Sequence, residues 1–188
     1  MAEVRVSPQE FHFVSFDAAR IAELTSTLAD QIGLPADAVI ELEIDESTPA
    51  TRVVTVSLDP IKLEVEGGAL EDPTVPRTLS DRLSADVLGR VLFRAADRLT
   101  PGFADAPADG DLDLQQQTAW DSYCMGRLDR LGYDVRLPRR QYHFRNRHGF
   151  SDVADGVFAR LWAADGLTWA DLQAGCDETA AARAAVSA

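Results

Sequence analysis

The residues with the strongest chemical signature lie in one short basic segment, RLPRRQYHFRNRH, at positions 136–148. The segment holds five arginines and two histidines and no acidic residue. The planar guanidinium group of arginine binds carboxylates and phosphates through two parallel hydrogen bonds. The candidate binding residues are therefore Arg136, Arg139, Arg140, His143, Arg145, Arg147 and His148.

The alternation of residue types predicts that a β-hairpin positions these groups, with its turn at 138–140. After the turn, Tyr142 and Phe144 would point to one side and rest on the core. The opposite side would carry His143, Arg145 and Arg147. We therefore expect a short basic hairpin that has an apolar side on the core and a guanidinium-rich side facing outward.

The charge of the whole chain makes this segment stand out. Thirty-one acidic residues against eighteen basic residues give a net charge of −13, and the five arginines of the segment leave the rest of the chain more negative still. Such a charge repels nucleic acids and anionic membranes at long range. The segment is therefore a local exception in an acidic protein.

Three interpretations of the basic segment remain open. In the first, its arginines pair with acids of the same chain, for which the candidates are Glu41, Glu43, Glu64, Glu66 and the loop at 101–113. In the second, they bind a small anionic ligand or an acidic protein partner, because arginine is enriched at interface hot spots. In the third, RNA bases stack on Tyr142 and Phe144, which the overall charge opposes.

Several enzyme chemistries lack the residues they need. Lys62 is the only lysine, and its alternating strand pattern turns it to solvent, which disfavours phosphate-loop and Schiff-base chemistry. The chain contains no Gly-x-Ser-x-Gly, no Gly-x-Gly-x-x-Gly and no His-Glu-x-x-His sequence. We expect no cofactor and favour a protein that is not an enzyme. The alternative is a small hydrolase with a dispersed site between two lobes.

The sequence also disfavours a metal site. His143 and His148 are five residues apart, a spacing that brings two side chains together on neither a helix nor a strand. Asp109, Asp111 and Asp113 match the first ligand positions of a calcium loop, but the glycine and the closing glutamate of such a loop are missing. We therefore expect no bound metal and interpret the aspartates as a solvated acidic loop.

The N-terminal half has the patterns of a mixed α and β lobe. In chain order they predict a strand at 10–16, a helix at 17–33, strands at 39–45, 52–58 and 61–66, and a helix at 79–99. Asp17 is a suitable N-cap for the first helix and Gly33 a suitable C-cap. The three consecutive strands predict an antiparallel meander with one buried face and one acidic face.

The C-terminal half is mostly helical by the same criteria. A loop rich in Pro, Gly and Asp at 101–113 separates a lobe at 1–100 from a lobe at 114–188 that shares its core. The second lobe is expected to contain helices at 114–131 and 151–165, the basic hairpin at 133–148, and a short last helix from Thr168. The apolar spacing predicts a core that includes Leu88, Leu92, Leu128, Phe158 and Trp162.

Taken together, the patterns predict an α+β protein: an antiparallel β-meander flanked by helices, then a mostly helical lobe with a short basic hairpin. No apolar run reaches the roughly 20 residues that cross a membrane, and the first residues do not resemble a secretory signal. Cys124 and Cys176 are expected to be free thiols in a reducing compartment. We therefore expect a cytoplasmic binding protein; the patterns do not predict its oligomeric state.

Overall fold

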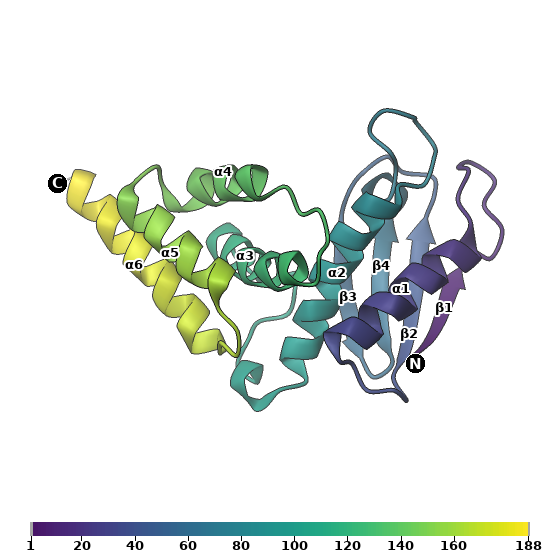
Figure 1. The fold of residues 1–188 in the computed structure, drawn as a ribbon, viewed down its shortest axis with the longest axis horizontal. Helices are drawn as coiled ribbons and strands as arrows, with labels where there is room; N and C mark the ends of the chain where they lie inside the picture. The colour runs from purple at the N-terminus through teal and green to yellow at the C-terminus, as the bar shows by residue number, and fades with distance from the viewer. Residues whose placement is uncertain (1, 188) are drawn as a thin grey trace. The chain divides into compact units, whose positions relative to one another are not determined.

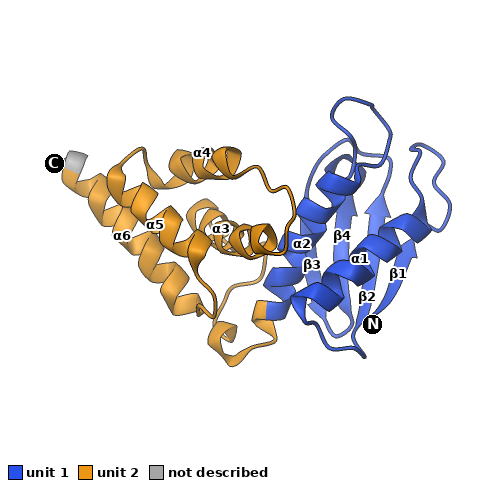
Figure 2. Ribbon diagram, viewed as in Figure 1, with its two compact units in different colours: residues 1–96 blue, residues 97–188 orange. Residues whose placement is uncertain are grey.

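The chain folds as two units, residues 1–96 and residues 97–188 (Figure 2). The computed structural model describes residues 2–187, and the side chains of residues 2–185. The first unit contains β-strands and helices, and the second contains helices only, as far as the described residues go.

The first unit is built on a four-stranded sheet with the strand order β1-β2-β4-β3. Its strands are β1 (Glu3–Ser7), β2 (Val39–Asp45), β3 (Val53–Leu58) and β4 (Ile61–Glu66). Strands β1 and β4 both run parallel to β2, and β3 runs antiparallel to β4. Parallel neighbours need a crossover connection, which α1 (Ala18–Ile32) provides between β1 and β2.

The predicted antiparallel meander is therefore wrong, and with it the predicted fold class. Three of the expected strands exist close to their expected positions, but β4 lies between β2 and β3 and runs parallel to β2. The short Asp59-Pro60 connection makes β3 and β4 a hairpin, whereas the longer segment 46–52 carries the chain from β2 to the edge of the sheet. Strand order depends on these connections, which the alternation of residue types does not report.

The expected first strand at 10–16 is also wrong. The first strand is β1, at residues 3–7, and the segment 10–16 is a loop. In this loop, Ser15 forms an isolated parallel bridge with Thr78. Two aromatic residues of the loop contact each other, since the rings of Phe11 and Phe16 meet edge to face with centroids 5.5 Å apart.

One face of the sheet is buried and the other is charged. The buried side chains are Ile40, Leu42 and Ile44 of β2 and Ile61, Leu63 and Val65 of β4. Helices α1 and α2 (Asp81–Arg98) lie over one face of the sheet (Figure 1), and the alternation of buried and exposed residues identifies it as the apolar one. On the other face, Lys62 Nζ lies 2.7 Å from Glu43 Oε2.

Helix α1 begins and ends at the predicted caps. The side chain of Asp17 accepts hydrogen bonds from the backbone N–H groups of Ala19 and Arg20, and Gly33 takes the left-handed conformation with φ of 83°.

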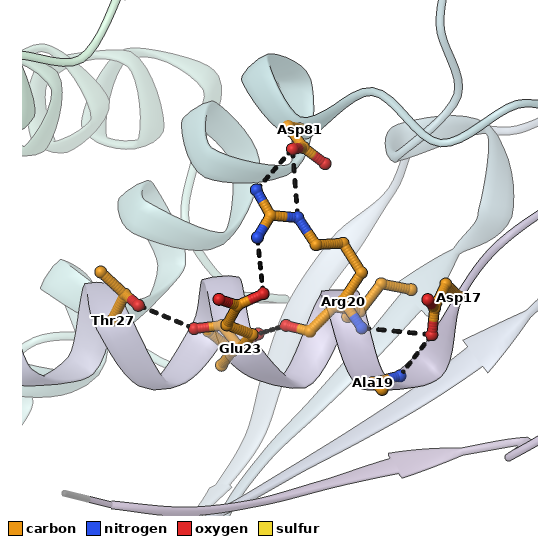
Figure 3. Close-up of polar contacts among 8 residues, drawn as sticks. Asp17, Ala19, Arg20, Glu23, Thr27 and Asp81 are labelled. Atoms are coloured by element: carbon orange, nitrogen blue, oxygen red, sulfur yellow. Dashed lines mark hydrogen bonds and ion pairs between the residues drawn. The ribbon is translucent and has the colours of Figure 1, made fainter.

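Arg20 links α1 to the first residue of α2 (Figure 3), because its Nε and Nη2 both donate to Asp81 Oδ2, at 3.1 and 2.6 Å. This hydrogen bond is the main cause that raises the pKa of Arg20.

The second unit is a cluster of helices. After a short 3-10 turn it contains α3 (Leu114–Arg130), α4 (Leu137–His148), α5 (Asp152–Ala163) and α6 (Trp169–Ser187). Trp120 and Tyr123 of α3 are fully buried, and Phe144 of α4 is buried as well. Helices α3 and α5 approach closely at Gly126, where a Cβ atom would lie 2.0 Å from the carbonyl oxygen of Trp162.

The predicted basic hairpin does not exist. Residues 137–148 form the helix α4, with Pro138 in its first turn, where a missing N–H costs nothing and the fixed φ suits a helix. The buried residues Phe144 and His148 are four apart, which is helical rather than strand spacing. The last helix, α6, is also longer than expected and runs from Trp169 to Ser187.

The predicted core is confirmed. The five side chains chosen from the apolar spacing are all buried, namely Leu88, Leu92, Leu128, Phe158 and Trp162. The helix periodicity therefore placed these five side chains correctly on α2, α3 and α5. The error at 133–148 arose where polar residues outnumber apolar ones and the periodicity is weak.

Candidate functional site

Four of the seven candidate residues share one side of α4, and Arg136 lies directly before the helix as its N-cap. Residues 139, 143 and 147 follow one another at intervals of four, and residue 140 precedes residue 143 by three, so a turn of about 100° per residue groups their side chains. We call this the basic face, which consists of Arg136, Arg139, Arg140, His143 and Arg147. All five are exposed except Arg140, which is half-buried.

Arg145 lies on another side of the helix and is engaged within the unit. Its Nε donates to Asp155 Oδ1 at 2.7 Å and its Nη2 donates to Asp155 Oδ2 at 2.6 Å. This two-pronged hydrogen bond lowers the pKa of Asp155 and joins α4 to α5. The structure thus places Arg145 in a structural contact, as the internal-pairing interpretation of the segment supposes.

His148 is buried in the second unit and has no access to solvent. Its ring stacks on Phe144 with a centroid distance of 3.9 Å and an interplanar angle of 7°. Both ring nitrogens have partners, since Nδ1 lies 2.8 Å from Thr179 Oγ1 and Nε2 lies 3.1 Å from the carbonyl oxygen of Gln115. His148 therefore joins α4 to α3 and α6 and does not belong to the basic face.

The positive groups of the basic face influence one another. The pKa of His143 is lowered, first by partial burial and then by the charges of Arg139, Arg140 and Arg147, while Asp121 acts in the opposite direction. Nearby positive charges disfavour protonation of an imidazole. The lowered pKa of His143 thus reflects partial burial first and the positive charge along this side of α4 second.

Three arginines of the basic face have no acidic partner. Within the described residues, the guanidinium groups of Arg136, Arg139 and Arg147 form no ion pair or hydrogen bond. Three of the acids that the sequence offered as partners are used inside the first unit: Glu41 pairs with Arg5, Glu43 with Lys62, and Glu66 accepts from the backbone of Arg52.

Neighbouring helices hold the end of α4 in place. The carbonyl oxygen of Arg147 accepts hydrogen bonds from Gln115 Nε2 at 3.0 Å and from Arg183 Nη1 at 3.1 Å. These contacts satisfy a carbonyl that the end of a helix leaves without an intrahelical partner. With the Arg145–Asp155 pair, they fix the orientation of the basic face relative to α3, α5 and α6.

Two exposed aromatic residues, Tyr142 and Phe150, flank the basic face. Tyr142 was expected on the core side of a hairpin strand, but its side chain is 57% exposed, and Phe150 is 66% exposed. Their rings meet edge to face with centroids 6.0 Å apart. A helical reading of 137–148 would have put Tyr142 on the outside, because it lies away from Phe144 and His148 in a helical projection.

Two aspartates of the loop at 101–113 have partners within the second unit. Asp109 pairs with Arg98 at 2.9 Å, and both side chains are almost completely covered. Asp113 caps α3 by accepting from the backbone N–H groups of Gln115 and Gln116. No cluster of three metal-ligating side chains with suitable geometry occurs among the described residues.

A second polar network of the second unit is satisfied internally. Arg127 donates to both carboxylate oxygens of Asp97, at 2.7 and 2.6 Å, and Trp120 Nε1 donates to the same carboxylate at 2.7 Å. The guanidinium group of Arg127 lies over the ring of Tyr123, 3.8 Å from its centroid. Because both carboxylate oxygens of Asp97 are used within the unit, the network stabilises the fold.

An open groove of about 460 Å³ lies on the charged face of the sheet. It is lined by Glu43, Ile44, Asp45, Arg52, Glu64, Val65 and Glu66. Several of its acids already have partners: Glu43 binds Lys62, and Asp45 accepts from the N–H and the hydroxyl of Ser47, which lowers its pKa. The groove is therefore a weaker candidate than the basic face.

The two cysteines are weak candidates for a reactive site. Both cysteines are buried free thiols, and burial raises the pKa of Cys176 to about 12, far from that of a reactive thiolate.

Among the described residues, no helix has the length and apolar character that a membrane span requires. Comparisons with protein-family models, with curated proteins and with solved structures give no significant match. The choice of the basic face as the candidate site is therefore based on its geometry alone.

Proposed function

We propose that this chain is a non-enzymatic binding protein that holds an anionic group of a partner on the basic face of α4. The observation that carries this proposal is the absence of ion pairs at Arg136, Arg139 and Arg147 within the described residues, in a chain with a net charge of −13. An acidic chain has ample carboxylates to neutralise three arginines. An exposed cluster that stays unneutralised is suited to an external anion.

The chemistry of the group favours carboxylates and phosphates. Each guanidinium offers a planar fork of N–H donors, and a charge-assisted hydrogen bond contributes about 1.5 kcal/mol or more. The anchored end of α4 keeps the arginines on one rigid element, which limits the entropy lost on binding. We also propose that the protein works in the cytoplasm, where the buried thiols Cys124 and Cys176 would stay reduced.

The test is a double substitution, Arg139→Gln with Arg147→Gln. We expect the wild-type protein to bind polyglutamate with an affinity that falls as salt increases. The loss of two charge-assisted hydrogen bonds should weaken this binding about 100-fold. The variant should remain folded, because both side chains are exposed. Fluorescence titration with polyglutamate measures the affinity. Thermal unfolding shows whether the variant is folded, and a series of phosphate concentrations shows whether an anion stabilises each protein.

The matched control is Arg5→Gln with Arg160→Gln. It removes the same charge from two other exposed positions, where the arginines pair with Glu3, Glu41 and Glu178. The control should keep most of the affinity for polyglutamate. Equal weakening in the two double variants would show that only net charge matters, and would contradict a specific site on α4.

A further inference from the structure

The exposed pair of Tyr142 and Phe150 extends the basic face into a mixed basic and apolar surface. On the helix, Tyr142 follows Arg139 by three residues and precedes Asn146 by four, so it is a direct neighbour of both. Phe150 follows α4 and reaches back to Tyr142, with 6.0 Å between the ring centroids. The two rings therefore border the arginine row on one side.

The connection that carries Phe150 is short and has anchored neighbours. Between α4 and α5 the chain turns at Gly149, whose φ of 104° is one that L side chains rarely adopt. Its N–H donates to the carbonyl oxygen of Arg145 at 2.8 Å. One residue beyond Phe150, Ser151 caps α5 by accepting from Ala154 N at 3.2 Å. Phe150 thus lies on a short connection that is anchored on both sides.

Exposed aromatic rings beside unneutralised arginines have the composition of a protein interface. Tyrosine and arginine are enriched at interface hot spots, and large exposed apolar side chains that lie together mark interaction surfaces. A free phosphate or sulfate could neutralise an arginine but would leave both rings in water. A partner with both carboxylates and an apolar side chain would complement the whole surface.

We propose that the partner is an acidic protein segment that places an apolar side chain against Tyr142 and Phe150 while its carboxylates bind Arg139 and Arg147. This inference rests on the function proposed above and specifies its partner. The charge complementarity is local, because the rest of the chain is negative. That negative charge disfavours a nucleic acid or an anionic membrane, whose charge extends well beyond a single helix face.

The experiment uses two synthetic peptides on the intact chain. The first is rich in glutamate and carries leucines at helical spacing, and the second has each leucine replaced by serine. We expect the wild-type protein to bind the leucine peptide about tenfold more tightly, because a leucine is removed from water at the ring pair. A single-stranded oligonucleotide and phosphatidylserine vesicles serve as competing anionic probes, and tighter binding of either would overturn the proposal.

The test variant is Tyr142→Gln with Phe150→Ser. It should abolish the preference for leucine and leave the affinity for the serine peptide unchanged. The control is Phe13→Ser with Val75→Gln, which removes two exposed apolar side chains of the first unit, of which Phe13 is as exposed as Phe150, at 66%. The control should keep the preference. Thermal unfolding checks that both variants are folded.

The two levels of the proposal fail in different ways. If Arg139→Gln with Arg147→Gln weakens both peptides, but the preference for leucine is absent or survives the loss of Tyr142 and Phe150, the aromatic contact is wrong and the anion-binding function stands. If the arginine substitutions change neither affinity, the proposed function itself is wrong.

Discussion

The Nδ1 atom of His148 lies 2.8 Å from the hydroxyl oxygen of Thr179, inside the second unit. The other nitrogen, Nε2, lies 3.1 Å from the carbonyl oxygen of Gln115, which can only accept, so Nε2 must carry a hydrogen. In the neutral ring, Nδ1 then accepts from the Thr179 hydroxyl. The single hydrogen of the hydroxyl also has the carbonyl oxygen of Cys176 as an acceptor, at 2.9 Å. In the protonated ring, Nδ1 would donate to the hydroxyl, which would then donate to this carbonyl.

The first prediction is that stability falls as the pH falls through the titration range of His148. Burial is the main cause that lowers the pKa of His148 in the folded protein, with Arg183 acting in the same direction and Asp113 and the Gln115 carbonyl in the opposite one. The unfolded chain, whose histidine has a pKa of about 6.5, therefore takes up the proton first. The stability due to the neutral ring is complete above that value and is lost as the pH falls toward the folded pKa.

Urea unfolding between pH 7 and 5 measures this effect. The pH dependence of the unfolding free energy should be smaller in His148→Gln than in the wild type. The same pH dependence in His148→Gln and in the wild type would mean that His148 is not the group that titrates.

The second prediction concerns the hydroxyl of Thr179. Thr179→Val keeps the shape of the side chain but leaves a polar atom of the buried ring without its partner, which should cost about 1–3 kcal/mol. Thr27→Val on α1 is the control, because it has the same effect on helix propensity at an exposed position; its hydroxyl donates only to a local carbonyl. Comparable losses in the two variants would contradict a special role for the His148–Thr179 contact.

The third prediction tests the core. Leu92 on α2 is completely buried, so Leu92→Ala should lower the unfolding free energy by roughly 2–5 kcal/mol through lost burial and a cavity. Leu99 lies just beyond the end of the same helix and is exposed, and Leu99→Ala should cost less than about 0.5 kcal/mol. Denaturant unfolding of both variants distinguishes a packed position from an exposed one.

The sequence predicted those elements whose signals are local. Helix α1 has an aspartate at its start and a glycine at its end, and both caps act within a few residues of the helix they bound. The order of the strands was not predictable in this way. The pairing of β2 with β4 is a contact across the whole segment 46–60, and an alternating pattern fits a parallel or an antiparallel neighbour equally well.

In the candidate site, too, local features were predictable from the sequence and long-range contacts were not. The composition of 136–148 located the arginines, but their separate roles depend on packing between helices. Arg145 meets Asp155 only because α4 and α5 lie side by side, and His148 is buried by residues from α3 and α6. Pro138 in the first turn was the local sign of a helix. With that helix in place, the spacing of the remaining basic residues defines one face.

The last prediction separates the paired arginine from an unpaired one. Arg145→Gln should lower stability, because it removes the partner of Asp155, whose pKa the hydrogen bond from Arg145 lowers. The stability from this pair is present above the unfolded pKa of an aspartate and is lost as the pH falls through the lowered pKa, so Arg145→Gln should also flatten the acid limb of the stability curve. Arg139→Gln should leave stability unchanged or raise it slightly, most clearly at low salt, because it relieves repulsion among like charges.

The pKa of His143 provides a second readout of the same two variants, by nuclear magnetic resonance. Arg139 is one of the charges that lower this pKa, whereas Arg145 is not among them. Arg139→Gln should therefore raise the pKa of His143, and Arg145→Gln should leave it in place. Increasing salt should raise the pKa in the wild type and reduce the difference between the wild type and Arg139→Gln. If Arg145→Gln shifted His143 as much as Arg139→Gln does, the grouping of these residues on one face of α4 would be wrong.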